Sequence, residues 1–224
     1  MSCSSSKHLE SCPVIVLGAG GHAVVVISSL RRLGVKILGV TSVVKSETRE
    51  ILGLPVLGRD EEVLTRNPTD IVLVNGIGAI EPGQTNRYLC AEKMRTLGYQ
   101  FYTVVDPSAI TVPEVSIGEG VQIMAGAVVQ PRTSIGTDCI INTGVQIDHD
   151  CEIGINCHVC PGTILAGHVQ VGQGSIIGAG TTVIPGVKIG AGSLIAAGSV
   201  IFKDVPSGSR IIQKRINLPS NQKT

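Results

Sequence analysis

The stretch that decides the fold runs from residue 115 to residue 156 and reads, in groups of six, VSIGEG, VQIMAG, AVVQPR, TSIGTD, CIINTG, VQIDHD and CEIGIN. The third residue of each group is aliphatic, and the first is small or β-branched. A period of six residues is the signature of a parallel β-helix. The aliphatic positions continue in one phase to residue 201: Ile117, Ile123, Val129, Ile135, Ile141, Ile147, Ile153, Val159, Leu165, Val171, Ile177, Val183, Ile189, Ile195 and Ile201.

This period has a direct structural meaning. Three groups of six close one triangular coil, so each aliphatic residue points inward and stacks on its counterparts in the coils above and below. Residues two apart on a strand share a face, so the small residue of each group also points inward. The groups make about five coils, which would stack to about 24 Å. We therefore predict an all-β parallel β-helix over residues 107–205, followed by a C-terminal tail over residues 206–224.

Residues 13–106 follow a different pattern, in which short apolar runs alternate with segments of helical length. Such alternation predicts a small Rossmann-like α/β domain with a parallel sheet. Asp106-Pro107-Ser108 is the expected junction with the repeats, because proline ends a strand. The expected strands and helices are, in chain order, residues 13–17, 23–32, 35–40, 70–74, 86–97 and 99–105.

A glycine-rich turn, Gly18-Ala19-Gly20-Gly21-His22, joins the first expected strand to the first expected helix. Such a turn gathers backbone N–H groups at a helix N-terminus, which favours a phosphate. NAD binding would require an acid about 20 residues later, and Leu38 to Ser42 contains none. The diphosphate of a nucleotide-sugar has no such requirement, so we favour that ligand over a tight turn without one.

Composition excludes several classes of function. The net charge is +1 with no basic run, and the chain has no Trp, three Tyr and two Phe. A nucleic-acid partner and a membrane partner both lack their signatures. Residues 1–12 are polar and Ser-rich without a hydrophobic core, so we expect a disordered tail and a cytoplasmic protein. Cys157 and Cys160 resemble a CxxC motif, but residues three apart on a strand face opposite sides, so we expect no metal there.

Three of the five histidines, at 149, 158 and 168, fall within two successive coils. His149 lies two positions after the inward Ile147, between Asp148 and Asp150, and is therefore expected on the rim of the prism. An imidazole held by a carboxylate is suited to general-base work at neutral pH. A solvated corner histidine is the alternative. We expect His168 to be an ordinary exposed residue.

Taken together, the Gly18–His22 turn, the segment with Asn142, His149-Asp150 and His158, and the hexapeptide array resemble the PglD/NeuD-type sugar acyltransferases. The resemblance covers nearly the whole chain beyond the N-terminal tail. It implies a left-handed β-helix, a homotrimer with an active site between neighbouring subunits, and acetyl-CoA as co-substrate. The implied reaction is N-acetylation of a UDP-, dTDP- or GDP-linked 4-amino-deoxysugar for bacterial surface glycan synthesis.

The resemblance also implies roles for individual residues. His149 corresponds to the general base, Asp150 to the acid that orients it, and Asn142 to a residue beside the acceptor. His158, Gly167, Ala179 and Ala197 correspond to positions along acetyl-CoA, with the Gly167 N–H facing the thioester oxygen. The nucleotide-sugar positions are Gly20, Gly21, His22, Ser42 and Gly78.

Two features depart from the family pattern. Relatives carry acids after the second strand, where this chain has Thr41, Ser42 and Val43. The basic residues Arg210, Lys214 and Arg215 replace the usual ending and could meet CoA phosphates or be solvated. O-acetylation of a sialic-acid-like sugar, a non-catalytic hexapeptide scaffold and a three-histidine zinc enzyme stay open as alternatives.

Overall fold

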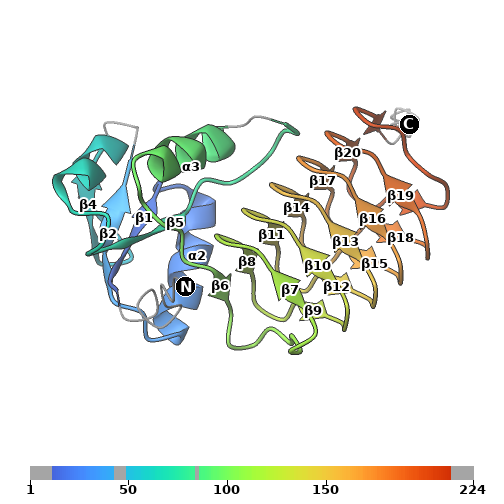
Figure 1. The fold of residues 1–224 in the computed structure, drawn as a ribbon, viewed down its shortest axis with the longest axis horizontal. Helices are drawn as coiled ribbons and strands as arrows, with labels where there is room; N and C mark the ends of the chain where they lie inside the picture. Colours follow the sequence, from blue (N-terminus) through green and yellow to red (C-terminus); the bar gives the residue numbers. More distant parts are fainter. Residues whose placement is uncertain (1–11, 43–48, 84–85, 213–224) are drawn as a thin grey trace, which may run out of the picture.

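The structure is a computed structural model, and it describes residues 12–42, 49–83 and 86–212. The expected N-terminal tail up to residue 11 and the basic residues Lys214 and Arg215 lie outside this range. The chain forms a small α/β domain followed by a stack of β-helical coils (Figure 1). Both predicted fold classes are therefore confirmed.

The N-terminal sheet has the strand order β3-β4-β2-β1-β5 and is parallel except for the β3–β4 hairpin. Helix α2 packs against one face of this sheet, while α3 and the 3-10 helix η1 pack against the other. The elements are β1 (Val14–Leu17), α2 (Gly21–Arg32), β2 (Ile37–Thr41), β3 (Glu50–Ile51), β4 (Leu54–Gly58), η1 (Asp60–Thr65), β5 (Val72–Asn75) and α3 (Asn86–Thr96).

In the sheet, β2 lies next to β1 on one side, and β5 lies next to β1 on the other side. Strand order therefore reverses between β1 and β5, and ligands of such sheets bind at the carboxyl ends of the strands at this point. The Gly18–His22 turn follows β1 there, and Gly76 to Gly78 follow β5. Gly76 allows this close approach, because a Cβ on it would lie 2.7 Å from the Val16 side chain.

The β-helix has three faces, each of which gains one two-residue strand per coil. Partner strands are 18 residues apart, as three groups of six require, except for the last pair, in which Leu194 pairs with Arg210. The first face contains β7 (Ser116–Ile117), β10 (Ser134–Ile135), β13 (Glu152–Ile153), β16 (Gln170–Val171) and β19 (Lys188–Ile189). The second contains β6 (Val104–Val105), β8 (Gln122–Ile123), β11 (Ile140–Ile141), β14 (His158–Val159), β17 (Ile176–Ile177), β20 (Leu194–Ile195) and β22 (Arg210–Ile211). The third contains β9 (Val128–Val129), β12 (Gln146–Ile147), β15 (Ile164–Leu165), β18 (Thr182–Val183) and β21 (Val200–Ile201).

Two-residue turns join the faces, and we number the corners by the face that precedes them. The second corner contains residues 143–144, 161–162, 179–180 and 197–198, and the third contains residues 131–132, 149–150, 167–168 and 185–186. The expected inward residues form one buried stack that includes Cys139, Cys151 and Cys157. Strand pairing extends past the expected limits of 107 and 205, since β6 pairs with β8 and β22 pairs with β20.

The two domains are joined by buried polar contacts. Asp106, at the expected junction, accepts hydrogen bonds from Ser29 of α2 and from Ser108, and it pairs with Arg32. On the other side of the sheet, Arg95 of α3 holds Asp138 of the β-helix through two hydrogen bonds of 2.6 and 2.8 Å. These contacts fix the carboxyl edge of the N-terminal sheet beside the second face of the β-helix.

Candidate functional site

The glycine-rich turn leaves the N-terminus of α2 open. Gly18 has a φ of +91°, which a residue with a side chain rarely adopts. Gly20 is different, because its φ of −86° suits any residue and a Cβ on Gly20 or Gly21 would meet nothing within 4 Å. The first turn of α2 has no acid and no side-chain cap. Its N–H groups and the space in front of them are therefore available to an anionic ligand.

This open helix end faces a cavity of about 1250 Å³ between the two domains. Seven of the expected site residues lie on its wall: Gly20, Gly21, His22, Ser42, Gly78, Asn142 and His158. Among the described residues of this wall, Glu50 of β3 carries the one carboxylate. No pattern in the sequence pointed to Glu50, because the hairpin that positions it was not expected.

His22 is held by a hydrogen-bonded chain that crosses the domain boundary. Its Nε2 lies 2.7 Å from Gln122 Oε1, while Gln122 Nε2 donates to the carbonyl of Asn75 over 2.7 Å. Since the amide nitrogen of Gln122 donates to Asn75, its oxygen must accept, so His22 donates through Nε2. Burial, aided by the positive charge of Arg87, lowers the pKa of His22 to about 4. His22 is therefore neutral at pH 7.

His158 is also neutral, and both of its ring nitrogens are engaged. Nδ1 lies 2.7 Å from the carbonyl of Ala79, so it carries the proton. Nε2 then accepts from the side-chain amide of Asn142 at 3.1 Å. Burial lowers the pKa of His158 and reinforces this state. His158 and Asn142 therefore form a fixed pair on the cavity wall, and neither ring nitrogen is free to accept a proton.

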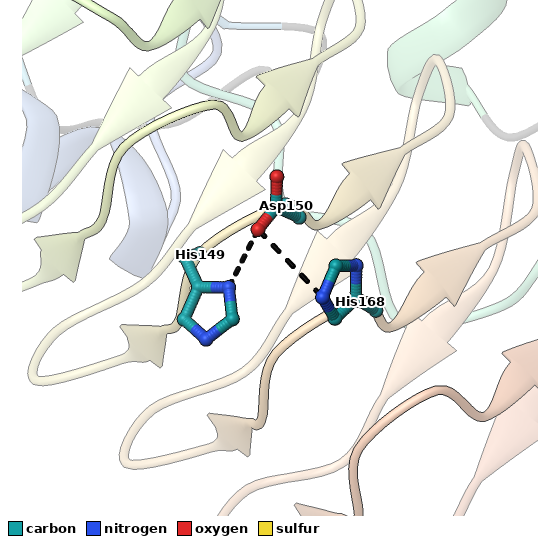
Figure 2. A group of neighbouring side chains, drawn as sticks. All are labelled: His149, Asp150 and His168. Atoms are coloured by element: carbon teal, nitrogen blue, oxygen red, sulfur yellow. Dashed lines mark hydrogen bonds and ion pairs between the residues drawn. The ribbon is translucent and has the colours of Figure 1, made fainter.

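His149 lies on the third corner and is held differently. Its Nδ1 is 2.6 Å from Asp150 Oδ2, and the rings of His149 and His168 form a T-shaped pair with centroids 5.2 Å apart (Figure 2). The side chain of His149 is 47% exposed, which confirms its expected position on the rim. With Nδ1 donating to the carboxylate, Nε2 carries the lone pair, and it has no partner among the described residues.

Asp150 is the centre of this group. Arg132, one coil earlier, donates hydrogen bonds to both carboxylate oxygens of Asp150. Its Nε donates to Oδ1 at 2.6 Å, and its Nη2 donates to Oδ2 at 2.7 Å. Hydrogen bonds from Arg132, and then from His149, hold the pKa of the Asp150 carboxyl well below its usual range. His168 Nε2 lies 3.7 Å from Oδ2. His168 is exposed, as expected from the sequence, with 65% of its side chain accessible, and it also lies beside this group.

Gly167 lies one coil above His149 in the same column of the third corner. A Cβ on Gly167 would lie 2.8 Å from His149 Cε1 and 2.9 Å from Nε2, so the ring occupies the space that a side chain would need. Among the described residues, no acceptor is within hydrogen-bond reach of the Gly167 N–H. The Gly167 backbone therefore lies against the His149 ring, and its N–H has no partner among the described residues.

His149, Asp150 and His168 could also serve as ligands of a metal ion, because their ligand atoms lie within 4.8 Å of one another. Two imidazoles and a carboxylate are donors that Zn²⁺ accepts. However, the Arg132 guanidinium already occupies both carboxylate oxygens and places a positive charge beside any cation. This arrangement favours the imidazole–carboxylate pair over a metal centre.

The chain does not bring all the expected catalytic residues together. Asn142 and His158 lie at the second face and second corner, whereas His149, Asp150 and Gly167 lie at the third corner. The third face separates these two groups by a distance on the order of 15 Å. Ala179 and Ala197 continue the second corner beyond the cavity, in a column with Thr143 and Pro161 that is joined by backbone hydrogen bonds. The expected acetyl-CoA positions are thus divided between two corners.

Two domain families match the sequence. Residues 13–82 match the PglD N-terminal domain, and residues 114–149 and 168–203 match the bacterial transferase hexapeptide. No curated protein sequence matches the chain. Within the described residues, neither helix has the length and apolar character needed to cross a membrane.

Solved structures match over most of the chain. PerB from Caulobacter crescentus, in complex with CoA and GDP-perosamine, is 37% identical with a TM-score of 0.81, covering 88% of this chain and 92% of that one. The acetyltransferase domain of PglB from Neisseria gonorrhoeae, in complex with acetyl coenzyme A, is 29% identical with a TM-score of 0.81, covering 88% and 94%. WeeI from Acinetobacter baumannii, at 21% identity and a TM-score of 0.70 over 89% and 95%, shares the fold.

Proposed function

This chain belongs to the PglD/NeuD-type sugar acyltransferases and is an acetyl-CoA-dependent sugar acetyltransferase, and from that premise we propose that it acetylates the amino group of a nucleotide-activated amino sugar. The observation that carries the proposal is the His149–Asp150 pair, in which a carboxylate fixes Nδ1 and leaves Nε2 without a partner among the described residues, next to the Gly167 backbone. The nucleotide would be UDP, dTDP or GDP, and the product would serve bacterial surface glycan synthesis. The reaction would take place in the cytoplasm.

His149 acts as the general base in this proposal. The amine of the sugar attacks the thioester carbon of acetyl-CoA, and Nε2 of His149 accepts a proton from the attacking nitrogen. The Gly167 N–H donates to the oxyanion of the tetrahedral intermediate. When the carbon–sulfur bond breaks, the protonated His149 returns its proton to the sulfur of CoA. Asp150 keeps the ring in the tautomer that makes Nε2 the acceptor.

The nucleotide-sugar would occupy the cavity between the domains. Its diphosphate would lie on the N-terminus of α2, at Gly20 and Gly21, where there is space and where the N–H groups have no partner among the described residues. His22 and Ser42 would contact the nucleotide portion, and Gly78 lines the same wall. Asn142, fixed by its bond to His158, would meet the acceptor end of the sugar. The similarity to PerB, solved with CoA and GDP-perosamine, supports this assignment.

A homotrimer would bring the two halves of the site together. The outward residues of the first face are polar (Ser116, Ser134, Glu152, Gln170 and Lys188), whereas those of the third face include the exposed Ile110, Ile164 and Val200. An exposed apolar face is typical of an interface. The second and third corners flank this face. Threefold packing on it would therefore place His149 of one subunit against the second corner of its neighbour.

The first experiment removes the base and keeps the fold. We expect His149→Ala to lower kcat by about 10²–10⁴-fold, measured as release of free CoA thiol with acetyl-CoA and a panel of nucleotide-linked amino sugars. Thr137→Ala, at the corresponding turn position of the first corner, is the matched control and should keep full activity. Normal turnover by His149→Ala would end the proposed role of His149.

The same panel distinguishes the choice of acceptor. An enzyme for amino sugars should be stabilised against heating by its nucleotide-sugar, because a ligand that binds only the native state raises stability. O-acetylation of a sialic-acid-like sugar is the alternative, and it predicts thiol release with the free sugar and no protection by nucleotide-linked sugars. Zinc found after purification, with activity lost on chelation, would favour the metal alternative.

A further inference from the structure

A column of side chains on the third corner occupies backbone positions that favour glycine. The second residue of every turn from Gly120 to Gly198 has a positive φ, and most of these residues are glycine. The exceptions are Arg132, Asp138, Asp150, Asn156 and His168. Left-handed backbone disfavours residues with a Cβ. Arg132, Asp150 and His168, at φ of 60°, 58° and 62°, nevertheless stand one coil apart in a single column, where their side chains meet.

The contacts of this column converge on the ring of His149. Arg132 binds the carboxylate through two parallel N–H groups, which fixes the plane of Asp150 as well as its position. Oδ2 of that carboxylate then accepts from Nδ1 of His149 at 2.6 Å. The ring of His168 lies beside that of His149 in a T-shaped arrangement with an interplanar angle of 90° (Figure 2). The Gly167 backbone lies on a third side, so the ring cannot shift toward it.

We propose that Arg132 and His168 are positioning residues that hold His149, through Asp150 and by ring contact, in the orientation that accepts a proton. The proposal rests on the proposed function of His149. Arg132 reaches neither the cavity nor the unpaired Gly167 N–H in the described structure, so it acts through Asp150 rather than on the substrates. His149 and Asp150 are both partly exposed, at 47% and 21% of their side chains, and an unsupported carboxylate on such a corner would rotate in solvent.

The backbone conformation makes glycine the informative substitution. Arg132→Gly removes the guanidinium while giving this corner the residue that its φ favours, so the melting temperature should stay equal or rise. We expect kcat to fall about tenfold while KM for both substrates stays within about twofold, since only the geometry of the base changes. His168→Gly should lower kcat about threefold in the same way. The matched control is Asn156→Gly, a left-handed corner residue whose side chain contacts Gly83, which should leave kcat unchanged.

Two further measurements separate positioning from charge and from folding. Arg132→Lys keeps the positive charge but lacks the two parallel donors, so its kcat should be as low as that of Arg132→Gly. Added guanidinium ion should raise the kcat of Arg132→Gly and should not raise that of Asn156→Gly. Wild-type kcat in Arg132→Gly, or a loss that only follows a lower melting temperature, would overturn the proposal.

Combining Arg132→Gly with His149→Ala distinguishes this inference from the proposed function. If His149 is the base and Arg132 acts through it, adding Arg132→Gly to the His149→Ala enzyme should cause no further loss of activity. An inactive His149→Ala enzyme with a fully active Arg132→Gly enzyme would reject the positioning role alone. An active His149→Ala enzyme would reject the base itself.

Discussion

Gly167→Ala tests whether the exact placement of the His149 ring limits the rate. The substitution keeps the backbone N–H that is proposed to bind the oxyanion. It should also be tolerated by the fold, because the residues in the same column of neighbouring coils, Pro131, His149 and Pro185, all carry a Cβ. The new methyl group would lie 2.8 Å from Cε1 of His149, about 0.6 Å short of the 3.4 Å at which ordinary contact begins.

The ring must therefore retreat by roughly half an ångström or rotate. Rotation would break the 2.6 Å hydrogen bond to Asp150, and His168 blocks one direction of retreat. A misplacement of about 1 Å can cost about 10²-fold in rate, so we expect kcat to fall about tenfold with little change in KM. The free energy of unfolding should change by less than about 1 kcal/mol, because His149 is half exposed and can move into solvent.

The assay is CoA-thiol release under saturating substrates, paired with thermal unfolding. In the His149→Ala background the ring is gone, so Gly167→Ala should have no further effect there. Wild-type kcat in the single variant would show that the position of the His149 ring does not limit the reaction.

Three further predictions follow from other parts of the structure. Gly20→Ala should leave the melting temperature unchanged, because its Cβ meets nothing within 4 Å. It should raise KM for the nucleotide-sugar and leave KM for acetyl-CoA unaffected. A wild-type KM for the nucleotide-sugar would exclude the N-terminus of α2 as the site of the diphosphate. His22 has a pKa of about 4 in the folded state, whereas in the unfolded chain this side chain is protonated below about pH 6.5. The free energy of unfolding should therefore fall by about 2 kcal/mol between pH 7 and pH 5. His22→Gln should remove this fall from the pH profile of stability, and an unchanged profile would show that His22 is not held neutral by the fold. Ile164→Glu on the third face should be monomeric by light scattering and should lack activity, whereas Gln170→Glu on the first face should remain trimeric. A fully active Ile164→Glu trimer would refute the interface.

Much of the site could be predicted, because the place of a residue in the six-residue repeat determines whether its side chain points into the core or outward. It places Ile147 inward and therefore His149 on the rim, and it shows Cys151 and Cys157 as buried core thiols. The glycine-rich turn likewise indicated an anion site at the N-terminus of the first helix, and the structure leaves that end open. These features depend on local spacing, which the sequence displays directly.

Other features could not be read from spacing. Arg132 and His168 reach Asp150 only through side-chain conformations at left-handed corner positions, where a glycine is the usual residue. Glu50 enters the cavity wall through a hairpin with too few residues to show a periodic pattern. The nitrogen that carries the proton on each histidine depends on partners that lie far away in the chain.

The sequence by itself determined the two folds, the inward and outward residues of the β-helix and the position of the glycine-rich turn, because these depend on residues at most six apart. Only the tertiary structure decided that His22 bonds to Gln122, that His158 has both nitrogens engaged and that His149 keeps one free. Such outcomes depend on how coils stack and domains dock, since hydrogen bonds between distant residues are settled by the packing of the whole molecule.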